Sequence, residues 1–272
     1  NGEIINADSM QVYKELKILS ARPDPKDYKK IKHHLYGFHN VKNNFSTGDW
    51  LKQAIKKIKE VKKRKKTPIF VGGTGLYFKA LIDGLVSIPN IPIRSRNKIR
   101  TLHNDLGQRK FYQKLLKLDP NSKDKINPTD AQRSIRAYEV KQFTKKSLHD
   151  WFKNTKSFFN KDEFFKIYIP REKLIQRIRK RTERMIKIGA IKEVKRFIKL
   201  KVKKDKSVNK AIGINEIRQY LHDKKNLSDV IEKISIKTRQ YAKRQSTWSR
   251  GNMMSWLKLL PQDLNKFLKK IK

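Results

Sequence analysis

Residues 4–13 read Ile-Ile-Asn-Ala-Asp-Ser-Met-Gln-Val-Tyr, so an apolar run ends in a carboxylate, a hydroxyl and an amide within four positions. In an α/β domain, ligands bind beyond the carboxyl ends of parallel strands, and a polar cluster placed there faces the crevice. We therefore interpret Asp8 as the base that takes a proton from a nucleophile bound in this crevice. The alternative is a plain strand-end turn, in which Asp and Ser are ordinary residues.

A second strand-end cluster lies at residues 68–81. Residues 68–71 (Pro-Ile-Phe-Val) predict a short buried strand, and Gly-Gly-Thr-Gly follows at 72–75 before a helical segment. Strand, glycine turn and helix is the geometry in which backbone N–H groups meet an anion, although this turn lacks the P-loop spacing. A generic tight turn is the alternative. Because Thr74 places a hydroxyl at the strand-end level of Asp8, we favour a functional turn.

Between these clusters the sequence predicts one helix that packs on a sheet. Ser46 and Asp49 are suited to cap its start. The adjacent His33 and His34 precede it on an extended segment, where they would point to opposite faces, so we expect a structural role rather than a metal pair. The helix carries an apolar stripe at helical spacing, formed by Leu51, Ala54, Ile55, Ile58 and Val61.

Strand signals vanish in the middle of the chain, where the sequence becomes helical and rich in aromatic residues. We predict an α/β core formed by residues 1–95 and 164–272, with an all-helical insertion over 96–163. The chain would return to the sheet with a strand at residues 163–169, followed by a long helix from Arg171 that Gly189 interrupts.

One helix of the insertion would begin at Thr129 or Asp130 as N-cap. Gln132, Arg133 and Arg136 occupy its first turns, and such side chains suit phosphate and base-edge contacts. A solvated helix face is the alternative.

The last third predicts a helical hairpin that opens at residues 211–216, with Ser228 as cap of its second helix. The far end of that helix, residues 237–248, interleaves Arg, Lys and Gln with aromatic side chains. This pattern suits an RNA loop whose bases are splayed and stacked. Trp248 suits a core position equally well.

Charge is the strongest feature of the composition. The chain has 272 residues, with 68 basic against 25 acidic residues and a net charge of +43. Such a field favours phosphate-rich partners, nucleic acid first, although an AT-rich coding sequence would also enrich lysine. With no cysteine, disulfides, thiolate metal sites and a cysteine nucleophile are excluded. No apolar run approaches the ~20 residues of a membrane helix and no signal peptide is present, so we expect a cytoplasmic protein without a membrane partner.

Taken in order, these segments resemble the tRNA dimethylallyltransferase (tRNA isopentenyltransferase) family over nearly the whole chain. Seven pieces in register carry the resemblance. They are Asp8–Tyr13, His33–Leu35, Gly72–Tyr77, Asp130–Arg133 leading into Arg136–Val140, Met185 to Gly189, Ala211–Gly213 and Thr238–Trp248.

The resemblance implies a P-loop NTPase-like parallel sheet with a helical insertion, acting as a monomer. It implies Mg²⁺ and dimethylallyl diphosphate, with the dimethylallyl group transferred to N6 of the adenosine 3′-adjacent to the anticodon of tRNAs reading U-starting codons. Asp8 would be the general base, and Thr74 a second catalytic residue that contacts the reacting region or the tRNA. Thr74, Gly73 and Gly75 would also bind the diphosphate. The tRNA anticodon stem-loop would be held by Asp8, Ser9, Met10, Gln11, Arg96, Gln132, Arg133, Ser134, Ile135, Arg136, Arg239 and Arg244.

Three departures from the family pattern matter. The family's phosphate-binding loop precedes the Asp-Ser segment, whereas this sequence begins at Asn1; we expect the loop and most Mg²⁺ ligands upstream, and the polypeptide as given to be inactive. Ile214 stands where the family usually has Tyr. The loop from Lys199 offers no arginine for the departing phosphate, and Lys203 or Lys204 would take that place.

Three other functions remain as alternatives. An adenylate-type isopentenyltransferase would act on a free nucleotide, and the insertion argues against it. A nucleotide kinase would need Asp8 for a metal or a phosphate. A basic RNA-binding module without chemistry would not require a carboxylate beside a glycine turn.

Overall fold

The computed structural model describes residues 1–86, 88–152, 165–223 and 226–270. It divides into two compact units, the first formed by residues 1–82 and 159–272 and the second by residues 83–158. The first compact unit ends at residue 82, whereas the predicted core segment ends at 95, and the helix that begins at Ile93 lies wholly in the second unit. The predicted 163/164 boundary lies outside the described residues.

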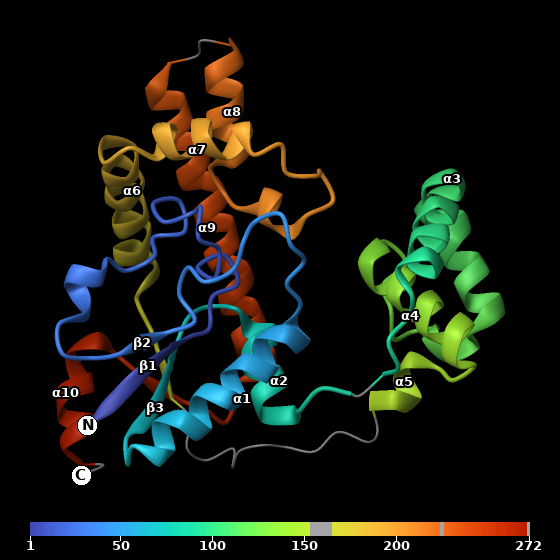
Figure 1. Ribbon diagram of the computed structural model, residues 1–272, viewed down its shortest axis with the longest axis horizontal. Coiled ribbons are helices and arrows are strands. Elements are labelled where there is room, and N and C mark those ends of the chain that lie inside the picture. Colours follow the sequence, from blue (N-terminus) through green and yellow to red (C-terminus); the bar gives the residue numbers. More distant parts are fainter. Residues whose placement is uncertain (87, 153–164, 224–225, 271–272) are drawn as a thin grey trace. The chain divides into compact units, whose positions relative to one another are not determined.

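The first unit contains a parallel sheet in the order β2–β1–β3 (Figure 1). β1 and β3 pair from Gly2–Thr67 to Asn6–Val71, so both strands end at the same level. This is the arrangement that the two strand-end clusters predicted. The elements are β1 (Gly2–Asn6), β2 (His33–His34), α1 (Thr47–Lys63), β3 (Thr67–Val71) and α2 (Gly75–Asp83), with a 3-10 helix at Pro25–Tyr28.

Helix α1 covers the sheet with its apolar face. Ser46 and Asp49 form the predicted capping box at its start. The indole of Trp50 is fully buried and stacks on Tyr77 at 4.1 Å between ring centroids. Its Nε1–H donates to the carbonyl of Asn6 at 2.9 Å, which ties α1 to the end of β1. The buried residues of this helix are Trp50, Leu51, Ala54, Ile58 and Val61.

The prediction that residues 68–71 form a buried strand is wrong as to burial. Ile69 and Val71 are 43% and 47% exposed, whereas Phe70 packs toward Trp50. β3 is an edge strand, and alternate side chains of a strand point to opposite faces. Among the described residues, the core lies against one face of β3 only.

The helices between residues 171 and 252 pack on one another (Figure 1). Gly189 separates α6 from α7 with φ +113°, a conformation that favours glycine. Asn226, not the predicted Ser228, caps α9, because its side chain accepts the Ser228 N–H. The bounds are α6 (Arg171–Lys187), α7 (Ala190–Lys199), α8 (Ile214–Asp223), α9 (Leu227–Asn252) and α10 (Leu264–Lys270), with 3-10 helices at Ser207–Lys210 and Pro261–Asp263.

The predicted return to the sheet at residues 163–169 is wrong. β4 (Phe165–Ile167) pairs with β5 (Leu257–Leu259) in a separate two-stranded sheet. Residues 163 and 164 lie outside the described residues. A short apolar run predicts a strand but contains no information about its partner, which here lies some ninety residues later in the chain.

The second unit is helical where it is described, as the sequence predicted. α3 bends at Gly107, whose φ of +67° is not helical. Asp130 caps α4, because its side chain accepts the Arg133 N–H at 3.0 Å. The elements are α3 (Ile93–Leu118), α4 (Ala131–Thr144) and α5 (Leu148–Trp151), with a 3-10 helix at Pro120–Ser122.

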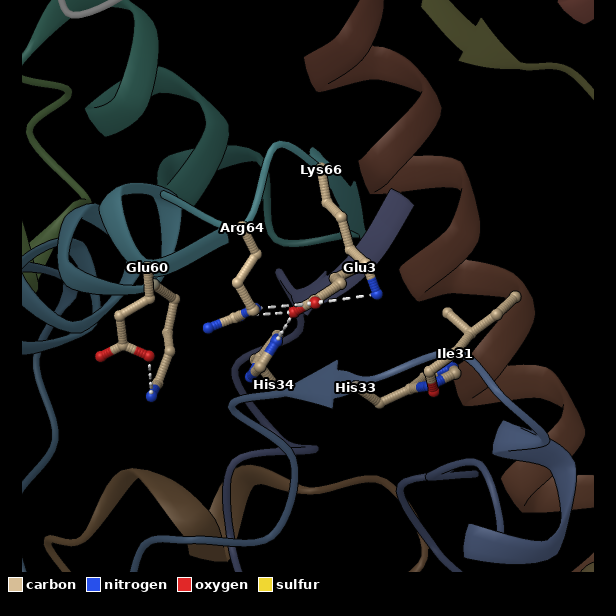
Figure 2. A network of polar contacts seen from close by, with 8 residues as sticks. Glu3, Ile31, His33, His34, Glu60, Arg64 and Lys66 are labelled. Carbon is tan, nitrogen blue, oxygen red and sulfur yellow. Dashed lines mark hydrogen bonds and ion pairs between the residues drawn. The ribbon is translucent and has the colours of Figure 1, made fainter. Parts of the chain in front are cut away.

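A buried carboxylate joins the elements at the start of β1 (Figure 2). Glu3 is fully buried, and the Arg64 guanidinium donates to its two oxygens at 3.0 and 2.6 Å. His34 Nε2 lies 2.7 Å and Lys66 Nζ 3.5 Å from the same carboxylate. The hydrogen bond from Arg64 chiefly, with that from His34, lowers the pKa of Glu3 to about 2. His34 thus has the structural role expected, as does His33, which stacks on Tyr28 at 4.0 Å.

We expect Glu3→Gln to lower the free energy of unfolding by about 2 kcal/mol at pH 7, because charged hydrogen bonds are lost inside the protein. A depressed pKa contributes stability above the unfolded-state pKa and loses it as pH falls through the folded-state value. The wild-type protein should therefore lose stability between about pH 4.5 and 2, and this slope should flatten in the variant. Urea unfolding over this pH range measures both effects.

The matched control is Glu60→Gln (Figure 2), which removes the same charge from a partly exposed pair with Lys57. Such pairs contribute little to stability. Equal losses in both variants would show that the Glu3 cluster is no more than surface charge.

Candidate active site

The two predicted strand-end clusters meet in the structure. Thr74 Oγ1 accepts the Ser9 N–H at 2.9 Å, and the Thr74 N–H donates to the Ala7 carbonyl at 3.1 Å. Because β1 and β3 end in register, the segment after each strand lies beside the other. Asp8 and Thr74 therefore belong to one site.

The Asp8 carboxylate is held through one of its oxygens. Oδ1 accepts the N–H groups of Met10 at 2.8 Å and Gln11 at 3.3 Å. Asn6 fixes the backbone of Asp8, since its Oδ1 accepts the Asp8 N–H at 2.9 Å and its Nδ2 donates to the Asp8 and Leu35 carbonyls, each at 3.0 Å. Within the described ranges, Asp8 Oδ2 accepts no hydrogen bond and is available to a ligand.

Burial controls the charge of this carboxylate. Desolvation raises the pKa of Asp8, while the Met10 and Gln11 N–H groups and the positive charge of Arg181 act in the opposite direction. Burial lowers the pKa of Arg181 in turn, and Asp8 opposes that shift. Arg181, on α6, was not among the predicted site residues, because a basic stripe along a helix does not indicate which arginine faces the sheet.

The charge of Asp8 contributes to raised pKa values of three tyrosines. The pKa of Tyr36 is raised to about 12, chiefly by burial and further by the neighbouring Tyr28 and Asp8. Burial and the charge of Asp8 also raise the pKa of Tyr77 and of Tyr241. These phenols stay protonated at neutral pH and can act as hydrogen-bond donors.

The glycine turn fits between β1 and α9 without room for side chains. A Cβ at Gly72 would lie 2.2 Å from the Ala7 carbonyl carbon and 2.7 Å from the Asp8 nitrogen. A Cβ at Gly75 would lie 2.4 Å from the Trp248 ring. The glycines are therefore required by close packing against protein, and the positive φ that glycine permits plays no part at these positions.

The stretch after Asp8 is turned partly inward. Gln11 Nε2 donates to the carbonyls of Ser20 at 3.0 Å and Ala21 at 3.3 Å. Met10 packs against the core of the first unit. The predicted tRNA contact through Gln11 thus has to compete with a hydrogen-bonding role inside the protein.

Comparison with known proteins decides the family. The sequence model for IPP transferase matches residues 11–252. The tRNA dimethylallyltransferase of Pelagibacter ubique is 59% identical, covering 100% of this chain and 87% of the relative, and that of Agrobacterium fabrum is 37% identical, covering 96% and 89%. This chain belongs to the IPP transferase family.

Solved structures of related enzymes share the fold. The tRNA isopentenylpyrophosphate transferase of Bacillus halodurans matches with a TM-score of 0.67 at 30% identity, covering 100% of this chain and 86% of that one. A eukaryotic dimethylallyltransferase acting on tRNA matches with a TM-score of 0.82 at 27% identity, covering 100% and 71%. The predicted α/β, P-loop-like fold is confirmed.

In the second unit of this IPP transferase, the predicted tRNA-binding residues divide into two groups. Arg96 and Arg136 both pair with the buried carboxylate of Glu139, at 3.6 and 3.4 Å. Ser134 is buried and Ile135 packs on the core of the unit, so both have structural roles. Gln132 and Arg133 are exposed, and the Arg133 side chain is 72% accessible beside Asp130.

Helix α9 carries the two remaining predicted arginines of the transferase. Arg239 donates to Glu232 at 3.1 Å. Arg244 lies over the Tyr241 ring, 5.5 Å from its centroid. The same helix contributes Gln245 and Trp248 to the packing of the glycine turn, a role that the sequence did not indicate because the contact spans 172 residues.

The departures from the family pattern have structural counterparts. Ile214 is fully buried, so it packs in the core of this transferase and offers no surface contact. Lys203 and Lys204 are exposed. Among the described residues, no group of three or more His, Asp or Glu could hold a metal ion. In the same part of the chain, no helix has the length and apolar character needed to cross a membrane.

Proposed function

We propose that the protein transfers a dimethylallyl group from dimethylallyl diphosphate to N6 of the adenosine 3′-adjacent to the anticodon, in tRNAs that read U-starting codons. The observation that carries this proposal is that Asp8, beside the Thr74 turn, has one oxygen, Oδ2, that accepts no hydrogen bond from any described residue. A partly desolvated carboxylate with one free oxygen suits a general base. The names of the relatives supply the substrate class.

In the proposed reaction, Asp8 Oδ2 takes a proton from N6 as the nitrogen attacks C1 of the allyl group. The C1–O bond breaks at the same carbon, and its electrons leave with the diphosphate. Negative charge grows on that leaving group and needs cations and N–H or O–H donors. Thr74 uses Oγ1 as an acceptor for Ser9, so its hydroxyl hydrogen remains free to donate. Arg181 supplies positive charge near Asp8.

Magnesium enters the proposal only with the diphosphate, whose oxygens commonly bind it with few protein ligands. The described residues do not by themselves form a magnesium site, and no step here is assigned to the ion. A monomer acting in the cytoplasm completes the proposal.

The test is transfer from labelled dimethylallyl diphosphate by the full-length protein, with nucleoside mass spectrometry of the product. We expect N6-dimethylallyladenosine beside the anticodon of unmodified tRNAs that read U-starting codons. A tRNA without that adenosine is the control acceptor, and AMP tests the adenylate-type alternative. Modification of AMP instead of tRNA, or binding of tRNA without transfer, would overturn the proposal.

We also propose that the Arg133 side chain binds a phosphate group of the tRNA backbone. We expect Arg133→Ala to weaken tRNA binding by about 1 kcal/mol, roughly fivefold, and to reduce the salt dependence of binding by the equivalent of about one phosphate contact. The melting temperature should hardly change, because the side chain is exposed. Filter binding at several salt concentrations measures the effect.

Arg109→Ala is the matched control, since it removes an exposed arginine from α3 of the same unit. If both variants weaken binding equally, the contribution of Arg133 is only its share of the net charge.

A further inference from the structure

We propose that Gln245 is a positioning residue: it holds the glycine turn from the side of α9, so that Thr74 stays bonded to the segment of Asp8. The inference deepens the proposed function and rests on it. Among the described residues, Gln245 forms no hydrogen bond with Asp8 or Thr74. It acts through the Gly73–Thr74 peptide group, whose carbonyl accepts its hydrogen bond.

The first observation is a hydrogen bond. Gln245 Nε2 donates to the Gly73 carbonyl at 2.9 Å. This carbonyl precedes α2 (Gly75–Asp83) and takes no part in the helical ladder, whose first bonds reach the Thr74 carbonyl. Without the Gln245 amide, a partly buried carbonyl would lose its protein donor. An unsatisfied carbonyl of this kind turns toward water, and the peptide it belongs to leads into Thr74.

The second observation is close packing. A Cβ at Gly73 would lie 2.1 Å from Gln245 Nε2, so the amide group lies directly against the backbone of the turn. One helical turn later, the Trp248 ring covers Gly75. On the other side, Gly72 lies against the backbone of Ala7. The turn is therefore held between the end of β1 and one face of α9.

The third observation connects the Gln245 hydrogen bond with the proposed reaction. Thr74 Oγ1 accepts the N–H of Ser9, the residue directly after the proposed base. A change in the Gly73–Thr74 peptide rotates this hydroxyl away from Ser9. The displaced group is then the Thr74 hydroxyl, which in the proposed function donates to the leaving diphosphate. Small errors of position at reacting groups lower the rate more than they lower affinity.

Gln245→Met is the informative variant, because methionine keeps roughly the length and volume of the side chain and removes the amide group, and with it the N–H that donates to Gly73. We expect the single-turnover rate of transfer in the full-length protein to fall about tenfold, with the tRNA dissociation constant within twofold of wild type. Gln53→Met, on the exposed side of α1, is the matched control and should keep the wild-type rate. A lower melting temperature with an unchanged rate would mean a merely structural role and would overturn the inference.

A double-mutant cycle separates action through Thr74 from any other effect. Thr74→Val alone removes the hydroxyl, and in that background Gln245→Met should cost little further rate. Additive losses in the double variant would refute the proposed route.

Hydrogen exchange gives a readout that does not depend on activity. We expect amides of residues 72–78 to exchange faster in Gln245→Met than in Gln53→Met. Unchanged exchange would sink the positioning role even if prenyl transfer itself were never observed. If the wild-type protein were inactive but exchange were still faster in Gln245→Met, the proposed function would be refuted. The conclusion that Gln245 holds the glycine turn in place would remain.

Discussion

Replacement of Asp8 by asparagine is expected to lower the rate of prenyl transfer about a thousandfold while tRNA binding stays within a few-fold of wild type. The size follows from the usual contribution of a general base. Asparagine can still accept the Met10 and Gln11 N–H groups through its carbonyl oxygen, so the local backbone should be preserved. Single-turnover transfer and filter binding on the same preparation measure the two quantities. Transfer near the wild-type rate would exclude Asp8 as the base.

The pH dependence of transfer gives a second measure of the same group. A general base works only when ionised, and burial raises the pKa of Asp8. The rate should therefore fall as pH drops through a value above that of an ordinary aspartate, and this acidic limb should vanish in Asp8→Asn.

Loss of activity in this variant should not come from unfolding. A carboxylate whose pKa is raised by folding opposes folding when it is ionised, so at neutral pH the wild-type group lowers stability. We expect the melting temperature of Asp8→Asn to equal or exceed that of wild type. A lower melting temperature would show that the negative charge stabilises this fold.

The second large effect is expected from Gly72→Ala. The new methyl group would lie 2.2 Å from the Ala7 carbonyl carbon and 2.3 Å from its oxygen, so the turn and the end of β1 must separate. Overpacking of this kind lowers stability by about 2 kcal/mol, and displacement of reacting groups by about 1 Å lowers the rate roughly a hundredfold. Urea unfolding and single-turnover transfer test the two parts.

Gly251→Ala is its matched control. Gly251 lies in α9, and a Cβ there would meet nothing within 4 Å. Alanine in a helix is more favourable than glycine, so this variant should be as stable as wild type or slightly more stable. If Gly72→Ala behaved like the control, the close approach of the two strand ends would be wrong.

Local chemistry made much of this structure predictable. The Ser46–Asp49 and Asp130 caps lie where the sequence placed them, because a cap depends on residues two or three positions away. The meeting of the Asp8 and Thr74 segments followed from a rule about parallel strands, which needs only that both runs be strands of one sheet.

Contacts across long sequence separations could not be predicted. The exposure of Ile69 and Val71 depends on which face of β3 other elements cover. The contact of Gln245 with Gly73 depends on where a helix some 170 residues later docks. No periodicity or local propensity contains that information, and it is the packing of whole elements that determines it.

Two of the four tryptophans of the chain lie against the segments that carry Asp8 and Thr74. The Trp50 indole donates to the Asn6 carbonyl, and the Trp248 ring covers Gly75. Indole emission responds to the polarity and the dipoles around the ring. The protein therefore has built-in optical reporters at this end of the sheet, and substrate binding there can be followed by intrinsic fluorescence without a dye.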